Sequence, residues 1–312
     1  MKKLMVMILA CFVLFGCQTT TKENAKDSAT VSVVDSVGNK VKVTKHTKKV
    51  VVLGSSWVEL YKLAGGMPIA TTSDAERFTY IKDNKDIEIV GDVKQPNFEK
   101  VVALNPDLVI LGEDLAGHQA LTTSLKDAKI PVFVTKVEKF DDYLAVLKSF
   151  TTITGDKEAY QSQGVAVQKK IDTLLAKIPD TEKGKQTALF MRGFSTNVKA
   201  IARDHTVTDI LDEIGITNIA QKDNFPLDTI SMEAILKDDP DYIFFTTMGD
   251  EEKAKENIKK SLEDDPSWAT LTAVKEGHVY YLEKDLYHYK PNARWAEAYE
   301  HILQIVYPDV YK

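Results

Sequence analysis

Two acidic residues occupy equivalent places in a segment that occurs twice in the chain. Residues 97–110 match residues 231–244 without a gap, and Glu99 and Glu233 are each followed by a Pro-Asp pair at the seventh and eighth positions and then by an apolar run. Pro-Asp commonly ends a helix before a strand, and the helix dipole stabilises an acid in the first turn, so a structural role for both acids stays open. The repeat predicts two similar structural units that each carry one such acid.

Arginine is scarce in this chain and unevenly placed. There are only four arginines, and three of them, Arg192, Arg203 and Arg294, fall near predicted loops of the second half. Arginine recognises carboxylate and catecholate oxygens through a planar fork and stacks on aromatic rings, whereas lysine serves general solubility. We therefore expect an anionic, planar or aromatic ligand. Ordinary salt bridges are the alternative for each arginine, and Arg294 could instead stabilise the start of the last helix.

Aromatic residues gather in the segment LYHYKPNARW, residues 286–295. Tyr287, His288 and Tyr289 offer groups that could fill open coordination positions on ferric iron, or rings that stack on a chelator or a porphyrin. Packing of a terminal helix explains Trp295 equally well. The segment is therefore a candidate ligand contact that could also be partly structural.

Several classes of protein are disfavoured by what the sequence lacks. The net charge of −6 is unsuited to nucleic-acid binding, which requires a basic surface. The sequence contains no G-x-S-x-G, H-E-x-x-H, Walker or G-x-G-x-x-G motif, and its histidines are scattered singly, so we expect no enzymatic activity. A carrier of free metal would need several His and acidic ligands at convergent spacings, and no clear set is present.

The N-terminus has the pattern of an export signal. Two lysines precede an apolar run that is too short to span a bilayer. The run ends in Leu14-Phe15-Gly16-Cys17, which resembles a bacterial lipobox, in which the cysteine is lipidated and becomes the first mature residue. A plain signal peptide with a chance cysteine is the alternative. We expect a signal peptide over 1–16 and a flexible, lipid-anchored tether over 17–30.

Alternating strands and helices must position these residues. Apolar runs of strand length occur at 50–53, 108–111, 187–194 and 242–247, with helical patterns between them, which is typical of parallel sheets covered by helices. Alternating apolar residues around a Gly-Asn pair predict a hairpin within 31–43. Residues 156–178 contain one glycine and no proline, and they predict a helix of roughly 35 Å that can connect two lobes.

The arrangement as a whole resembles the substrate-binding proteins of ABC importers for ferric siderophores, haem and cobalamin, from about Lys48 to the end of the chain. The resemblance implies an α/β fold of two Rossmann-like lobes with parallel-type sheets, joined by one long helix in the helical-backbone (class III) manner, with the ligand in a cleft between the lobes. It implies an N-terminal lobe over 31–155, a connecting helix over 156–180 and a C-terminal lobe over 181–312. It also implies that Glu99 and Glu233 dock on arginines of the two permease subunits.

The resemblance places the ligand at strand ends facing the cleft. The candidate ligand-binding residues are Trp57, Tyr80, Lys94, Arg192, Arg203, Met248, Tyr287, His288, Tyr289 and Arg294. Among these, His288, Tyr289 and Met248 are candidate iron contacts. The haem-binding members hold iron through a methionine and a histidine at the places where this chain has Lys94 and Met248, so the usual pair is absent. We therefore rank the candidate ligands with ferric siderophores first, haem second, and free metal or a corrinoid after these.

The same resemblance predicts how the protein works in the cell. It would be exported and anchored by its lipid to the outer face of the membrane, in a cell of Gram-positive type, and would act as a monomer. Its partners would be an ABC permease dimer with ATPase subunits and a small-molecule iron complex, with no nucleic acid. No permanent cofactor is expected, because the iron is carried within the bound ligand.

Overall fold

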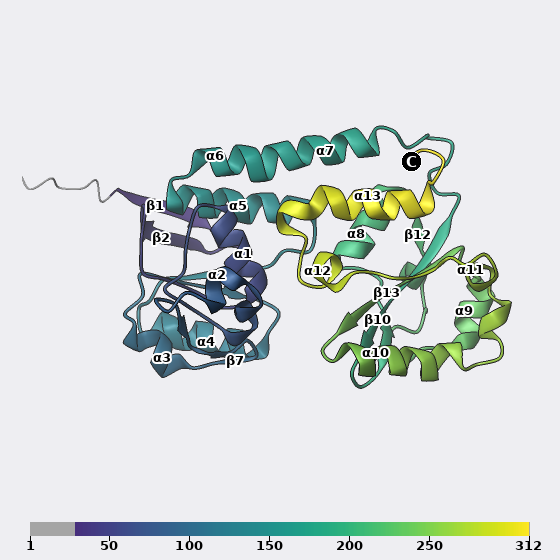
Figure 1. Ribbon diagram of the computed structural model, residues 1–312, viewed down its shortest axis with the longest axis horizontal. Helices are drawn as coiled ribbons and strands as arrows, with labels where there is room; N and C mark the ends of the chain where they lie inside the picture. Colours follow the sequence, from purple (N-terminus) through teal and green to yellow (C-terminus); the bar gives the residue numbers. More distant parts are fainter. Residues whose placement is uncertain (1–28, 312) are drawn as a thin grey trace, which may run out of the picture.

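A computed structural model of the chain describes residues 29–311. The predicted signal peptide, Cys17 and almost all of the predicted tether lie outside the described residues. Two α/β lobes lie side by side, and one long helix runs along both of them (Figure 1). The predicted fold class is confirmed. Within residues 29–311, no helix combines the length and the apolar character that crossing a membrane requires.

The N-terminal lobe is built on a parallel sheet of order β5-β4-β3-β8-β9. Its central strands are fully buried, because helices cover both faces of the sheet, and this explains their continuous apolar runs. The strands are β3 (Val50–Val52), β4 (Ala70–Thr71), β5 (Glu88–Ile89), β8 (Leu108–Gly112) and β9 (Val132–Thr135), and the helices are α1 (Ser55–Leu63), α2 (Thr79–Lys82), α3 (Phe98–Ala103), α4 (Ala116–Asp127) and α5 (Phe140–Thr154).

Two hairpins complete this lobe. The predicted hairpin is present as β1 (Thr30–Val34) and β2 (Lys40–Thr44), and Gly38 in its turn has φ +86°, a conformation that favours glycine. A second, short hairpin pairs β6 (Gly91–Asp92) with β7 (Gln95–Pro96). The turn of this second hairpin carries Lys94 toward the other lobe.

The C-terminal lobe has a sheet of order β11-β10-β13-β14, with β12 also paired to β10. All its pairings are parallel except that of β10 with β11, which the short connection between these strands makes antiparallel. The strands are β10 (Thr187–Phe194), β11 (Val198–Ala200), β12 (Thr217–Asn218), β13 (Tyr242–Met248) and β14 (Val279–Tyr281), and the helices are α8 (Thr206–Glu213), α9 (Met232–Asp238), α10 (Glu251–Ile258), α11 (Thr272–Lys275), α12 (Lys284–Tyr287) and α13 (Trp295–Val306).

The helix that runs along both lobes consists of α6 (Lys157–Tyr160), a π-helical turn (Gln161–Val165) and α7 (Ala166–Leu175). A helix was predicted over 156–178, and the observed one is slightly shorter. Its single glycine, Gly164, lies in the π-helical turn, where an added Cβ would be 3.1 Å from the side chains of Leu144 and Leu147. Glycine thus lets this helix approach α5 closely.

One hydrophobic core extends from the N-terminal lobe into the C-terminal lobe beneath this helix. Trp295, at the start of α13, is completely buried and meets Phe140 of α5 edge-on, with ring centroids 5.9 Å apart. The hydroxyl of Tyr143 donates to the Gln163 carbonyl oxygen at 2.8 Å and so ties the N-terminal lobe to the connecting helix, whereas Tyr299 donates to Glu213 at 2.8 Å within the C-terminal lobe. The lobes are therefore joined by packed side chains as well as by the chain itself.

Replacing Trp295 by alanine should destabilise the protein by about 3–5 kcal/mol, because it would leave a cavity in the core that both lobes share. Urea denaturation followed by circular dichroism would measure the free energy of unfolding. The control is Leu227→Ala, at a position that is 38% exposed, where a change below about 0.5 kcal/mol is expected. If the two variants were equally stable, the shared core would not be what holds the lobes together.

Candidate functional site

A cleft of about 470 Å³ lies between the two lobes. Its walls come from the carboxyl ends of β3, β8, β10 and β13 and from the segment that links α12 to α13, which is the edge where ligands bind in α/β proteins. The lining residues are Gly54, Ser55, Ser56, Trp57, Asp74, Val93, Lys94, Asp114, Leu115, Phe194, Ser195, Thr196, Met248, Gly249, Lys284, His288, Tyr289 and Lys290.

Five of the predicted ligand-binding residues line this cleft: Trp57, Lys94, Met248, His288 and Tyr289. Trp57 and Lys94 come from the N-terminal lobe, and the other three come from the C-terminal lobe. The turn that carries Lys94 lies directly on α4, where a Cβ on Gly117 would be 2.0 Å from the Lys94 carbonyl oxygen. Glycine at position 117 therefore positions Lys94, because any side chain there would push the turn away.

Arg192, another predicted residue, does not line the cleft but contacts a residue that does. Its Nη2 lies 2.7 Å from Nδ1 of His288. Burial lowers the pKa of Arg192, although Glu138 and Asp114 oppose this effect. Burial, together with the nearby Arg192 and Lys284, lowers the pKa of His288 to about 3, so this imidazole is neutral at physiological pH.

Four predicted residues, Tyr80, Arg203, Tyr287 and Arg294, do not line the cleft. Tyr287 is 1% exposed, and its hydroxyl contacts the Ala298 carbonyl oxygen and Nδ1 of His301, each at 2.9 Å. Arg294 pairs with Glu297 at 2.5 Å at the start of α13, which is the structural alternative that the sequence left open. Arg203 is exposed and lines no pocket described here. Tyr80 packs on the core and stacks on Phe78, with ring centroids 5.2 Å apart.

Sequence reasoning missed several charged residues of the cleft. Lys290 pairs across the lobes with Glu138 at 3.1 Å, and both side chains are less than 20% exposed. Asp74 accepts hydrogen bonds from the Ser55 N–H and the Thr72 hydroxyl, so it shapes the turn after β3. Lys290 belongs to the segment 286–295 that was singled out, although it was not named as a ligand contact, and Lys284 lies just before that segment. This proximity was the one signal that could have found them.

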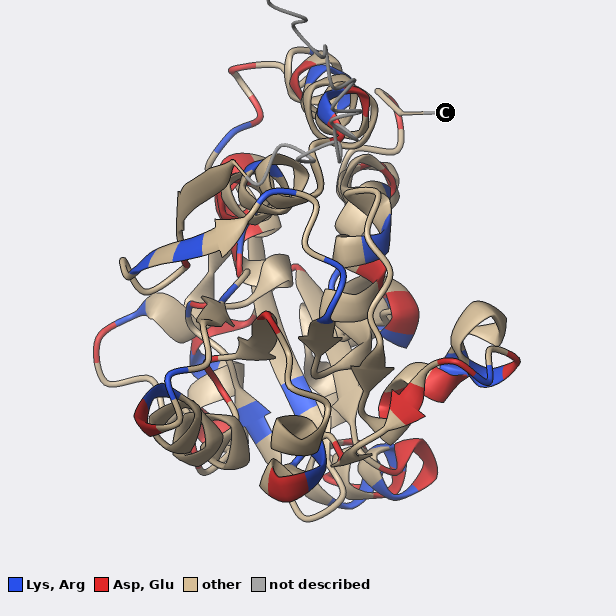
Figure 2. Cartoon of the chain, turned by 90° about the vertical axis from the view of Figure 1, so that its left-hand side faces the viewer, with Lys and Arg blue, Asp and Glu red and all other residues tan. Residues whose placement is uncertain are grey.

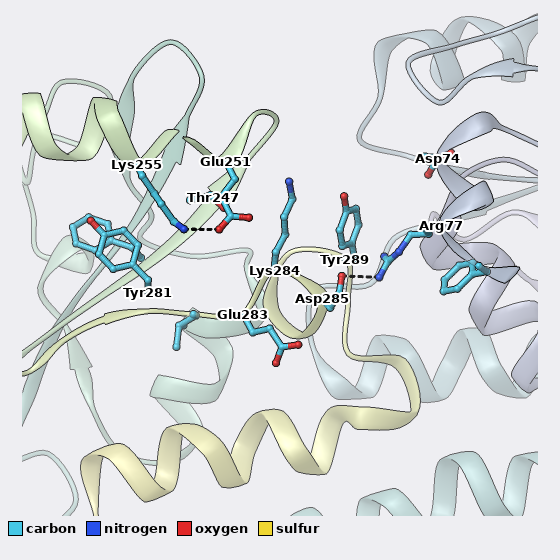
Figure 3. Close-up of a pocket in the computed structure, with 13 residues that line it drawn as sticks. Asp74, Arg77, Thr247, Glu251, Lys255, Tyr281, Glu283, Lys284, Asp285 and Tyr289 are labelled. Atoms are coloured by element: carbon cyan, nitrogen blue, oxygen red, sulfur yellow. Dashed lines mark hydrogen bonds and ion pairs between the residues drawn. The ribbon is translucent and has the colours of Figure 1, made fainter. Parts of the chain in front are cut away.

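A second pocket of about 780 Å³ adjoins the cleft and shares Asp74, Lys284 and Tyr289 with it. Figure 3 shows Tyr289 between Lys284 and Arg77. The Arg77 guanidinium carbon lies 4.0 Å from the centre of the Tyr289 ring, and Arg77 pairs with Asp285 at 2.6 Å across the lobes. Tyr289 therefore forms a wall between the two cavities, and its position depends on contacts from both lobes.

The described part of the chain offers no ready site for a bare cation. Within residues 29–311, no three His, Cys, Asp or Glu side chains gather closely enough to hold a metal ion. Met248, His288 and Tyr289 all line the cleft, but one imidazole nitrogen of His288 already contacts Arg192. The cleft instead presents ammonium groups and aromatic rings, which suit a ligand with anionic oxygens and flat surfaces.

Glu99 and Glu233 occupy matching positions on the two lobes. Each is exposed and is the second residue of a short helix, α3 or α9. The residues Asn97 and Ser231 cap these helices by accepting hydrogen bonds from the N–H groups of Lys100 and Ala234. Figure 1 places α3 and α9 on different lobes, both away from the α6–α7 helix. The sequence repeat is thus a structural repeat that presents one acid per lobe.

The fold and the cleft define the class of this molecule as a binding protein that holds its ligand between two α/β lobes. The model of the periplasmic binding protein family matches residues 50–286, and the chain belongs to that family. The family is one of binding proteins, and the names of the relatives that follow describe binding and transport rather than catalysis.

Three similar proteins illustrate the relationship. The chain is 28% identical over 293 residues to the Fe(3+)-citrate-binding protein YfmC of Bacillus subtilis (strain 168), with 90% of this chain and 88% of that protein covered. It is 28% identical over 318 residues to the uncharacterized ABC transporter substrate-binding lipoprotein YvrC of the same strain, with 98% and 96% covered. The periplasmic catecholate-siderophore binding protein VctP from Vibrio cholerae is similar in fold, with a TM-score of 0.69 at 18% identity over 86% of this chain and 97% of that chain.

Replacing Lys290 by methionine should destabilise the protein by about 1–3 kcal/mol at pH 8, because Glu138 would then be ionised and largely buried without its partner. Burial already raises the pKa of Glu138, which Lys290 partly offsets, so removing Lys290 raises that pKa further. The loss is therefore largest at high pH and shrinks as the pH falls and Glu138 takes up a proton.

Urea denaturation at pH 8 and at pH 5 would test this pH dependence. The matched control is Lys260→Met, which removes a partner of Glu256 from an exposed ion pair and should leave the free energy of unfolding unchanged within error. If Lys290→Met lowered the free energy of unfolding equally at both pH values, Lys290 would not be what stabilises the ionised form of Glu138.

Proposed function

We propose that this protein is the substrate-binding lipoprotein of an ABC importer and captures an iron complex, a ferric siderophore in the first place, in the cleft between its lobes. The observation that carries the proposal is a cleft lined by lysines and aromatic rings in a member of a family whose relatives include an Fe(3+)-citrate-binding protein. The iron is cargo, held by its chelator, and the protein needs no permanent cofactor.

The charges of the cleft favour an anionic chelate. Lys94 and Lys284 line it from opposite lobes, and Lys94 forms no ion pair with any residue in the described range. Asp74 and Asp114 also line the cleft. The carboxylate of Asp74 is already engaged by the Ser55 N–H, so it opposes the lysines less than a free carboxylate would. Trp57 and Tyr289 supply aromatic faces for the chelator. A ligand bound there would meet positive charge from both lobes.

Haem is the second candidate because Met248 lines the cleft and thioether sulfur is a known haem ligand. The contact between His288 and Arg192 disfavours a Met–His pair on one iron. A siderophore needs no such pair, because the chelator satisfies the iron. Free metal and corrinoids come after these, as they did from the sequence.

Delivery would follow capture at the membrane. Lipidated Cys17 would hold the protein on the outer face of a membrane, as the lipoprotein relative supports. The monomer would dock through Glu99 and Glu233 on an ABC permease dimer with its ATPase subunits. One exposed acid on each lobe suits a partner with two-fold symmetry, and docking could pull the lobes slightly apart. The protein itself would perform no chemistry.

Quenching of tryptophan fluorescence should identify the ligand class. Ferric citrate, a ferric catecholate, hemin and cobalamin would each be titrated into the full-length protein in mild detergent. All three tryptophans are largely buried, but only Trp57 of the three lines the cleft, so saturable quenching by a ferric chelate should vanish in Trp57→Phe. Trp295 is completely buried in the core that both lobes share and does not line the cleft. Saturation by hemin or cobalamin alone would overturn the siderophore assignment.

The double variant Glu99→Ala/Glu233→Ala should abolish uptake of the iron complex by cells while leaving its affinity for the protein unchanged. The physical reason is that both side chains are exposed on helices away from the cleft residues. Radioactive iron uptake and fluorescence titration would measure the two effects. The control, Glu76→Ala/Glu252→Ala, changes two exposed glutamates, also one per lobe, and should take up iron normally. Weaker ligand binding in the first variant would refute the docking role.

A further inference from the structure

The position of Arg192 determines which ring nitrogen of His288 carries the proton. Its Nη2 lies 2.7 Å from Nδ1 of His288. A guanidinium group has only donors and keeps its charge in proteins, so Nδ1 must accept this hydrogen bond through its lone pair. A neutral imidazole that accepts at one nitrogen carries its proton on the other. His288 is therefore an Nε2–H tautomer while the contact persists.

The surroundings of His288 oppose a second proton. Arg192 on β10, Lys284 on α12, Lys290 in the following segment and Arg77 of the other lobe all add positive charge, and with burial they lower the pKa of the imidazole to about 3. The ring of Tyr289 lies edge-on, with centroids 4.9 Å apart. The imidazole is thus neutral throughout the pH range in which the protein would work.

The guanidinium of Arg192 has no competing hydrogen-bond partner besides His288 among the described residues. Its Nε is buried without a hydrogen-bond partner, and the contact to His288 is the only hydrogen bond that its guanidinium makes within residues 29–311. The Nε2 of His288 makes no hydrogen bond to any described residue, and it is not among the fully buried unpaired atoms. The proton on Nε2 is therefore available to a molecule in the cleft, which His288 lines.

We propose that Arg192 acts as a positioning residue that holds His288 as an Nε2–H donor, so that His288 binds an anionic oxygen of the ligand and does not ligate iron. The inference rests on the proposed function and narrows it to chelates that complete the coordination of iron themselves and present carboxylate or phenolate oxygens outward. Iron ligation by His288 would require its proton to move to Nδ1, at the cost of the hydrogen bond from Arg192. This reverses our expectation that His288 is an iron contact.

The tautomer can be read without any ligand. Long-range ¹H–¹⁵N spectra of histidine-labelled full-length protein, with His288→Gln used for assignment, should show a single neutral Nε2–H form of His288 from pH 5 to pH 8. In Arg192→Met, the same residue should show mixed tautomers and titrate at a higher pH. An Nδ1–H form or an imidazolium at pH 7 in the wild type would overturn the proposal.

The donor role is tested with ferric citrate and a ferric catecholate as probes. His288→Gln retains an N–H donor and should bind within about three-fold of the wild type, whereas His288→Phe keeps a ring without a donor and should bind about ten- to a hundred-fold more weakly. If phenylalanine bound as tightly as histidine, or if glutamine were as weak as phenylalanine, the donor role would be wrong.

Hemin distinguishes the two possible roles of His288 directly. A histidine-ligated absorption spectrum of the wild type with hemin that is lost in His288→Gln would show iron ligation and overturn the proposal. If the wild type bound none of these complexes, the proposed function would fail together with the donor role, and the tautomer would still be decided by the spectra of the ligand-free protein.

Discussion

The core that runs without interruption from one lobe into the other constrains the rest of this molecule. Trp295 and Phe140 meet in it edge-on, and the α6–α7 helix covers it along both lobes. Separating the lobes at this end would expose large aromatic side chains to water. Aromatic side chains bury large apolar areas, so their exposure costs much free energy. This cost favours small rotations about this end over wide opening, and it favours a cleft whose walls are largely preformed before a ligand arrives.

The preformed cleft carries charge that is only partly compensated. The pair of Glu138 and Lys290 is buried between the lobes, and its attraction does not fully repay desolvation, since the pKa of Glu138 remains raised. Arg192 is partly buried and lies beside a neutral imidazole rather than a carboxylate. Figure 2 shows that acidic and basic residues are otherwise interspersed along the elements of the chain. The cleft thus offers the ammonium groups of Lys94 and Lys284 to an anionic ligand, while the carboxylates of Asp74 and Asp114 in the same lining oppose them in part.

Much of the fold could be predicted from the sequence, because apolar runs buried on both faces read directly as strands and the long glycine-poor segment reads as a helix. The site was harder. Sequence reasoning named the segment 286–295 but could not say which side chains face the cleft: Tyr287 is the last residue of α12 and points into the core, while His288 and Tyr289 follow it into the cleft. Nothing in the sequence pointed to Glu138, because its ion pair with Lys290 forms only where the two lobes meet.

Contacts near the cleft are of a different kind from those in the core. Arg77 pairs with Asp285, Asn292 donates to Glu59 at 2.7 Å, and the Ser56 hydroxyl donates to the Tyr289 carbonyl oxygen, all between lobes. Polar contacts of this kind are replaced by water when they separate, so they cost far less to open than the aromatic core. A permease that pulled on α3 and α9 would therefore loosen the cleft before the core. Because Tyr289 is held by both lobes, such a rotation would shift one wall of the binding site and weaken its hold on the ligand, so the proposed docking would be coupled to release.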